Sequence, residues 1–198
     1  MKKVEIESQR YVWEDIFKVE EAYLRFEKFD GSMSDTIRRI NFERGNSVAV
    51  LVYNLDTKKL VLLNQFRYPA YVENGPGWIT EVIAGIIDSG EAPEESARRE
   101  AQEETGLEVE NVEFIASFYP SPGGCSEQIN LYYVEISGEK TKYNETGGLA
   151  SEDENIRTFE LSMDEALGQI RTGEICDAKT ILGIYWLENR LLKKLFTN

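Results

Sequence analysis

Residues 85–107 read GIIDSGEAPEESARREAQEETGL, and this stretch predicts more about the protein than any other. Its pattern is typical of a helix with a loop on either side. Pro93 suits the first turn of a helix, because the N–H that it lacks would have no partner there. Gly106 stands where a glycine commonly ends a helix, since glycine adopts a positive φ without strain. We therefore predict a helix between these two residues.

Three glutamates cluster near the end of this helix. Glu100 and Glu104 are four residues apart, so they share a face, and Glu103 lies beside them. Like charges at this spacing repel by about 0.2–0.5 kcal/mol per pair, and a divalent cation would make the arrangement favourable. Oxygen ligands favour a hard ion, which indicates Mg²⁺, with Mn²⁺ as a substitute. The alternative, more common for an arbitrary acidic helix, is a face that simply meets solvent.

The residues that flank the helix help to decide between these interpretations. From Gly85 to Leu107, the chain resembles the Nudix box, glycine-x5-Glu-x7-Arg-Glu-apolar-x-Glu-Glu-x-Gly-apolar, and it matches at every defined position. In that family the box is a loop–helix–loop that binds a divalent metal and hydrolyses a nucleoside diphosphate linked to another group. The resemblance therefore implies a metal-dependent hydrolase and disfavours a solvated helix face.

The resemblance also implies roles for individual residues. The arginine of the box orients the carboxylates, and Glu103 is a metal ligand directly or through water. The loop GGLASEDEN at 147–155 resembles the mobile loop that carries the catalytic base in this subgroup, although such a loop taken alone is more often solvated. Metal binding lowers the pKa of water, and a nearby carboxylate then takes the proton. The implied catalytic residues are Glu152 as the base, Glu103 and Arg99, and the implied metal ligands are the Ala84 carbonyl, Glu100, Glu104 and Glu154.

A second resemblance concerns the substrate. Ser-Pro-Gly-Gly at 121–124 resembles the branch of the family that hydrolyses ADP-ribose and other nucleoside diphosphate sugars. Lys179 matches a lysine of the GDP-mannose subgroup, and a pair of arginines matches basic residues that reach a neighbouring subunit's site. The implied substrate-binding residues are Arg38, Arg39, Arg67, Glu127, Asp153 and Lys179. The aromatic residue that stacks on the base is open between Trp13, Phe17 and Tyr23.

Composition excludes several other classes of protein. The net charge of −14 argues against broad contact with a nucleic-acid backbone. The chain has no histidine, so acid–base chemistry near neutral pH falls to carboxylates, lysine, tyrosine or water on a metal. No run of 18 apolar residues predicts a membrane span, and the first residues lack an apolar signal core, so we expect a cytoplasmic protein. Cys125 and Cys176 are too few for a zinc site or a disulfide framework.

The remaining sequence predicts an α+β fold, which the resemblance sharpens to the α/β/α Nudix sandwich with a mixed sheet. We predict two domains: an N-terminal antiparallel β element at 1–43 and a Nudix catalytic domain at 44–198. In the first, 16–29 and 36–42 are strands around an Asp-Gly turn. In the second, strands are expected at 47–53, 60–66, 78–84, 112–119, 129–136 and 156–161. Ser162 begins a helix that ends at Gly173, and Asp177 caps a last helix.

The resemblances together imply a hydrolase that cleaves the diphosphate of nucleoside diphosphate sugars to a nucleoside monophosphate and a sugar phosphate. ADP-ribose is the favoured substrate and GDP-mannose the alternative. A non-catalytic ADP-ribose sensor is a further alternative from another class, but such modules commonly lose box carboxylates, and this chain keeps all of them. Because the N-terminal element is too small to fold alone, we also expect a homodimer.

Overall fold

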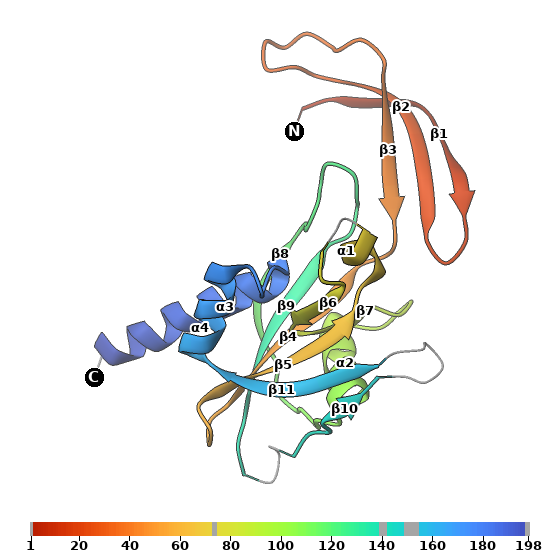
Figure 1. Ribbon diagram of the computed structural model, residues 1–198. Coiled ribbons are helices and arrows are strands. Elements are labelled where there is room, and N and C mark those ends of the chain that lie inside the picture. The colour runs from red at the N-terminus through yellow and green to blue at the C-terminus, as the bar shows by residue number, and fades with distance from the viewer. Residues whose placement is uncertain (1, 73–74, 139–141, 149–154, 197–198) are drawn as a thin grey trace. The chain divides into compact units, whose positions relative to one another are not determined.

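The computed structural model of the protein describes residues 2–72, 75–138, 142–148 and 155–196 (Figure 1). The chain divides into two compact units. The first comprises Met1–Asn46 and Tyr119–Gln128, and the second comprises Ser47–Phe118 and Ile129–Asn198. The segment that contains Ser-Pro-Gly-Gly therefore belongs with the N-terminal strands. The assignment of 1–43 and 44–198 as two domains stays a prediction.

The first unit contains a three-stranded antiparallel sheet in the order β1-β2-β3. Its strands are β1 (Val4–Glu14), β2 (Lys18–Phe26) and β3 (Ile37–Glu43). Gly31 has a φ of +84°, which fits the predicted turn between the second and third strands. The antiparallel character agrees with the sequence analysis, but β1 was not predicted as a separate strand.

The second unit is built around a mixed sheet, which has eight strands in the described part of the chain. The main path runs β10-β11-β5-β4-β9-β8, with β6 paired to β5 and β7 paired to β4. Only the β4–β9 pair is parallel among the described strand pairs of this sheet. The strands are β4 (Ser47–Asn54), β5 (Lys59–Phe66), β6 (Trp78–Glu81), β7 (Ile83–Ile86), β8 (Glu113–Phe118), β9 (Ile129–Ile136), β10 (Thr146–Gly147) and β11 (Ile156–Ser162).

The side chains of β4 alternate between two hydrophobic cores, one on each face of the sheet. Val48, Val50 and Val52 pack in the core that includes Ala97 and Ala101 of helix α2 (Pro93–Thr105). The intervening residues of β4 pack in the other core, with helices α3 (Met163–Thr172) and α4 (Ala178–Phe196). Helices thus cover both faces, as Figure 1 shows, which confirms the predicted α+β class and α/β/α sandwich.

The caps predicted for these helices are present. Gly106 follows α2 with a φ of +75°, and Gly173 follows α3 with a φ of +82°. The Ser162 hydroxyl accepts a hydrogen bond from the Glu165 N–H, and the Ser162 N–H donates to the Glu165 carboxylate. A short helix, α1 (Tyr68–Val72), was not predicted. No helix in the described part of the chain is both long and apolar enough to cross a membrane.

The prediction of one continuous strand at 78–84 was wrong, and the reason concerns the site. The strand is interrupted at Val82: before it β6 pairs with β5, and after it β7 pairs with β4. The Val82 N–H donates to the Thr180 hydroxyl oxygen at 2.9 Å instead of to a neighbouring strand. The strand β7 then lies along the first half of β4, and it carries Ala84 and Gly85 towards α2.

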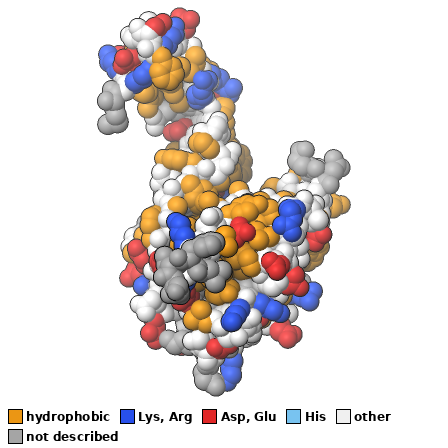
Figure 2. All heavy atoms as spheres, turned by 90° about the vertical axis from the view of Figure 1, so that its left-hand side faces the viewer, with side chains coloured by type: hydrophobic (Ala, Val, Ile, Leu, Met, Phe, Trp, Pro, Cys, Tyr) orange, Lys and Arg blue, Asp and Glu red, His pale blue; other side chains and the backbone are white. Residues whose placement is uncertain are grey.

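The outer side of α4 exposes large hydrophobic side chains beside charged ones. Leu182, Tyr185 and Leu192 are exposed there, and Lys193 and Lys194 lie in the last turn. Figure 2 looks at the side on which α3 and α4 lie in Figure 1, and it shows hydrophobic side chains with basic and acidic ones around them. The acidic surplus of the chain is therefore not gathered into a single patch on this face.

Candidate active site

Helix α2 is fixed by small residues on its inner side. Ala97 and Ala101 are fully buried against the sheet, which brings the helix axis close to β4 and β7. Glu100 and Glu104 lie at the edge of this buried face, at 9% and 3% exposure. The two carboxylates that the sequence places on one face of the helix are therefore largely withdrawn from water, unlike those of an ordinary solvated helix.

The backbone of β7 lies directly on these carboxylates. A Cβ at residue 85 would come within 1.9 Å of the Glu100 carboxyl carbon, so a larger residue there would displace that carboxylate. The Ala84 N–H donates to Glu104 Oε2 at 3.2 Å. The first glycine of the box therefore leaves room for the Glu100 carboxylate, and its neighbour Ala84 is hydrogen-bonded to Glu104.

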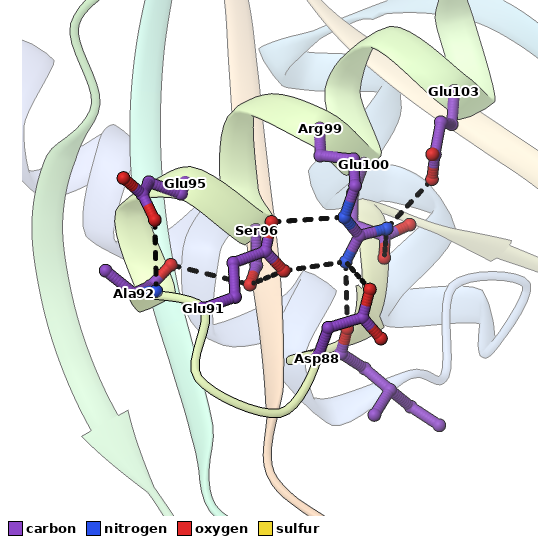
Figure 3. A network of polar contacts seen from close by, with 9 residues as sticks. Asp88, Glu91, Ala92, Glu95, Ser96, Arg99, Glu100 and Glu103 are labelled. Carbon is purple, nitrogen blue, oxygen red and sulfur yellow. Dashed lines mark hydrogen bonds and ion pairs between the residues drawn. The ribbon is translucent and has the colours of Figure 1, made fainter.

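Arg99 donates hydrogen bonds to three carboxylates of the box (Figure 3). Its Nη1 donates to Glu100 at 2.8 Å and to Glu103 at 2.9 Å. Its Nε and Nη2 donate to the two oxygens of Glu91, and Nη2 also donates to the Ile86 carbonyl. The Ser96 hydroxyl donates to Glu91 at 2.6 Å. We call these side chains the Arg99 cluster: Glu91, Ser96, Arg99, Glu100 and Glu103.

The charges of the Arg99 cluster stabilise one another. Hydrogen bonds from Arg99 and then from Ser96 lower the pKa of Glu91 below its ordinary value. The hydrogen bond to Glu91, helped by the charge of Glu100, raises the pKa of Arg99. Both groups are consequently ionised at neutral pH, and the loop before α2 is tied to the helix that follows it.

The donor set fits a hard divalent cation. The box offers only oxygen ligands: the carboxylates of Glu100, Glu103 and Glu104 and the backbone carbonyl of Ala84. The missing side chain at Gly85 leaves the space beside Glu100 to its carboxylate. Within the described ranges no three acidic side chains lie at metal-ligand spacing, and Arg99 holds the carboxylates of Glu100 and Glu103.

Several predicted site residues lie after the box, in the loop at 147–155. Gly147 of β10 lies on the end of α2, where a Cβ would come within 1.9 Å of the Glu104 carbonyl oxygen. The chain that leads into the acidic loop therefore starts next to Glu104. Glu152, Asp153 and Glu154, predicted as base, substrate contact and metal ligand, lie outside the described residues.

Two predicted substrate residues are joined by a carboxylate that the sequence analysis did not identify. Glu81, at 2% exposure, accepts from Arg67 Nε at 2.7 Å and from Lys179 Nζ at 2.6 Å. Lys179 also donates to Asp177 at 3.0 Å. Burial alone opposes the charge of Lys179, but the charges of Glu81 and Asp177 outweigh it and raise its pKa. With Thr180, these side chains form what we call the Glu81 cluster: Arg67, Glu81, Asp177, Lys179 and Thr180.

One sequence signal pointed to Glu81. It is a charged residue inside the mainly apolar run Trp-Ile-Thr-Glu-Val-Ile-Ala, whereas a half-buried strand would ordinarily alternate apolar and polar residues. A buried carboxylate needs a partner, but its partners lie 14 and 98 residues away in sequence, so spacing could not identify them.

The remaining substrate-binding predictions belong to the first unit. Arg38 donates to Glu21 at 2.5 Å, and Arg39 donates to the Arg38 carbonyl at 3.0 Å. Glu127 pairs with Arg44 at 3.6 Å. These three residues are thus placed within their own unit, and their roles in binding substrate stay predictions.

Comparison with known proteins identifies the family. The family described as NUDIX domain matches residues 43–181. An ADP-ribose pyrophosphatase from Escherichia coli is 35% identical over 185 residues, covering 93% of this chain and 88% of that protein. A GDP-mannose pyrophosphatase from Cronobacter sakazakii is 38% identical over 188 residues, covering 94% and 96%. A solved structure titled as an ADP compounds hydrolase shares the fold, with a TM-score of 0.67 and 18% identity over 97% of this chain and 96% of that one. The chain therefore belongs to the Nudix family of hydrolases.

Proposed function

We propose that the protein hydrolyses the diphosphate bond of nucleoside diphosphate sugars, with ADP-ribose favoured, to a nucleoside monophosphate and a sugar phosphate. The observation that carries this proposal is the pair of buried carboxylates, Glu100 and Glu104, against Ala84 and Gly85 of β7. The relatives named ADP-ribose and GDP-mannose pyrophosphatase match nearly the whole chain and support the substrate class.

The proposed chemistry assigns a task to each group. Glu100, Glu104 and the Ala84 carbonyl would hold the metal, with Mg²⁺ preferred and Mn²⁺ as a substitute, and Glu154 would complete the set. Bound there, the metal neutralises part of the diphosphate charge and lowers the pKa of the attacking water. Arg99 keeps the carboxylates of the box in place. Water attacks one phosphorus of the diphosphate. The bond between that phosphorus and the bridging oxygen breaks, and the bridging oxygen leaves with the other phosphate.

We assign the proton of the attacking water to Glu152. The position of Gly147 against the Glu104 backbone supports this, because it begins the acidic loop beside the proposed metal ligands. Glu152→Gln should lower kcat more than it weakens substrate binding, because a base acts only after the substrate is bound. An unchanged kcat would transfer the role to Glu103 or Glu127.

The test of function is release of monophosphate from a panel of ADP-ribose, GDP-mannose, ADP-glucose and diadenosine compounds. It should be run with Mg²⁺, with Mn²⁺ and with excess chelator. We expect turnover of ADP-ribose in the presence of Mg²⁺ and none with chelator. Hydrolysis in ¹⁸O-labelled water would show by mass spectrometry which phosphorus is attacked. Binding of ADP-ribose without hydrolysis under all these conditions would favour the sensor instead.

GDP-mannose is the second candidate substrate. The Cronobacter sakazakii relative carries that name at 38% identity, and Lys179 matches a lysine of that subgroup. The ratio of kcat/KM for the two compounds in the same assay separates the candidates. A ratio well above unity for GDP-mannose would reverse the preference.

We also propose a homodimer located in the cytoplasm. The sheet of the first unit and the turn between β1 and β2 expose many large apolar side chains for their size, which favours coverage by another chain. They include Val4, Ile6, Tyr11, Val12, Trp13 and Ile16. Light scattering at about micromolar concentration should give twice the mass of the chain, and a monomer mass would contradict the dimer.

A further inference from the structure

We infer that Glu81 is a positioning residue: its buried carboxylate fixes Arg67 and Lys179 side by side, so that both cations are presented together to the diphosphate of the substrate. The inference rests on the proposed function and goes beyond it, because neither the sequence pattern nor the relatives' names assign any role to Glu81.

The geometry gives each oxygen of Glu81 one cation. Oε1 accepts from Arg67 at the end of β5, and Oε2 accepts from Lys179 in the first turn of α4. The carboxylate is 3% exposed and the Lys179 side chain 12%, whereas the Arg67 side chain is 40% exposed. The anchor is thus covered while the arginine reaches the surface, which is the arrangement expected of a support beneath a binding residue.

The Glu81 cluster is also tied to the strand that carries the metal-site backbone. Asp177 accepts from the Thr180 hydroxyl at 2.6 Å, and that hydroxyl accepts from the Val82 N–H at 2.9 Å. Val82 is the residue at which β6 gives way to β7, two residues before Ala84. The start of α4 therefore fixes Lys179 and the course of β7 through the same few hydrogen bonds.

The charges of the Glu81 cluster balance in the free protein, because two cations face the two carboxylates of Glu81 and Asp177. A buried pair is weak evidence for stability, because desolvation offsets much of the attraction, whereas it does fix geometry. A dianionic substrate would use two cations that are already oriented, which saves the entropy of ordering them.

The experiment compares Glu81→Gln with wild type and with Glu113→Gln. The control removes a carboxylate that pairs with Arg190 in the same unit, with Glu113 50% exposed. Glutamine keeps the size of the side chain but loses one acceptor and the charge. For Glu81→Gln we expect KM for the preferred substrate to rise roughly 10- to 100-fold, with kcat changed much less. Glu113→Gln should match wild type, and Glu81→Asp should recover part of the loss because it restores the charge.

A double variant keeps the inference testable if Glu81→Gln is unstable. Lys179→Met with Glu81→Gln removes one positive and one negative charge, so no charge of that pair is left buried alone. If Glu81 acts by positioning its two cations, the double variant should raise KM by less than the product of the two single effects, because Glu81 then has no lysine left to position. Multiplied effects of the two changes would overturn the inference.

The outcomes separate this inference from the proposed function. If wild type hydrolyses the substrate and Glu81→Gln has the same KM, the role of Glu81 is refuted while the function stands. A merely structural role would show in a different way: in Glu81→Gln, kcat and the melting temperature would fall while KM rises, and Glu81→Asp would recover none of these properties. If wild type neither binds nor hydrolyses any compound of the panel, the function is refuted and the role of Glu81 with it.

Discussion

The two ionic clusters of the second unit are built in opposite ways. In the Arg99 cluster one cation holds several carboxylates, and its members lie within 13 residues of one another in sequence. In the Glu81 cluster one buried carboxylate holds two cations, which lie 14 and 98 residues away from it in sequence. The first, as we propose, organises the ligands of a metal cation, and the second, as we infer, organises the contacts of an anion.

The difference shows how an acidic protein with a net charge of −14 can bind an anionic substrate. Carboxylates gathered around Arg99 suit a metal ion, which would bring positive charge to the site. Arg67 and Lys179 add fixed cations, and Glu81 keeps them in place instead of leaving them to solvent. Bulk charge therefore says little about the charge of the site itself.

The largest expected effect is at Glu104, which lies on the same helix as the Arg99 cluster but is not part of it. Glu104→Gln should lower turnover by roughly two orders of magnitude or more, because a neutral amide is a poor ligand for a hard cation. The protein should stay folded, since the amide oxygen can still accept from the Ala84 N–H. Steady-state kinetics and circular dichroism measure the two properties.

The control for this change is Glu108→Gln, an exposed glutamate just beyond α2. Its kinetics should match wild type. Near-normal turnover in Glu104→Gln would contradict the proposal that this carboxylate binds the metal. The contrast between a metal-binding group of acids and a substrate-binding group of cations would then lose its support.

A smaller effect is expected when the centre of the Arg99 cluster is removed. Arg99→Met leaves Glu91, Glu100 and Glu103 without their shared donor, so turnover should fall roughly 10- to 100-fold. Arg99→Lys should recover little, because one ammonium cannot replace a fork that reaches five acceptor oxygens. Titration with Mn²⁺ followed by electron paramagnetic resonance should show weaker metal binding. Unchanged metal affinity with reduced kcat would instead place Arg99 at the substrate.

The pH dependence of stability should separate the clusters by sign. The pKa of Glu91 is lowered from 4.5, so its contribution is present above that value and is lost as pH falls through the lower folded pKa. The pKa of Lys179 is raised from 10.5, so its contribution is present below that value and is lost as pH rises through the higher folded pKa. Urea unfolding of Glu91→Gln should therefore converge with wild type in acid, and that of Lys179→Met in base. Convergence of both variants at the same end would contradict the contrast.

The smallest effect compares two helix caps. Ser162→Ala and Asp177→Ala each remove a side chain that accepts from the first turn of a helix, and each should cost about 1 kcal/mol of unfolding free energy. Only Asp177 also holds Lys179, so Asp177→Ala alone should raise KM, by several-fold. Equal kinetics for both variants would mean that Asp177 is only a cap.

Local pattern predicted a large part of the fold. The hairpin of β4 and β5, the helix of the box and the capped helix α3 all follow from neighbouring residues, and the structure has them where expected. The prediction of a continuous strand at 78–84 was wrong because the Val82 N–H donates to the hydroxyl of Thr180. Strand propensity has no access to a donor–acceptor pair 98 residues apart.

The sequence by itself determined the box, because a helix places residues three and four apart on one face wherever it is found. It therefore placed on one helix the acids that we propose as metal ligands, and the arginine among them. Only the tertiary structure decided that Gly85 lies against Glu100, that β7 begins at Ile83, and that Glu81 joins Arg67 to Lys179. Those contacts join distant segments, and they form only when the helices close over the two faces of the sheet.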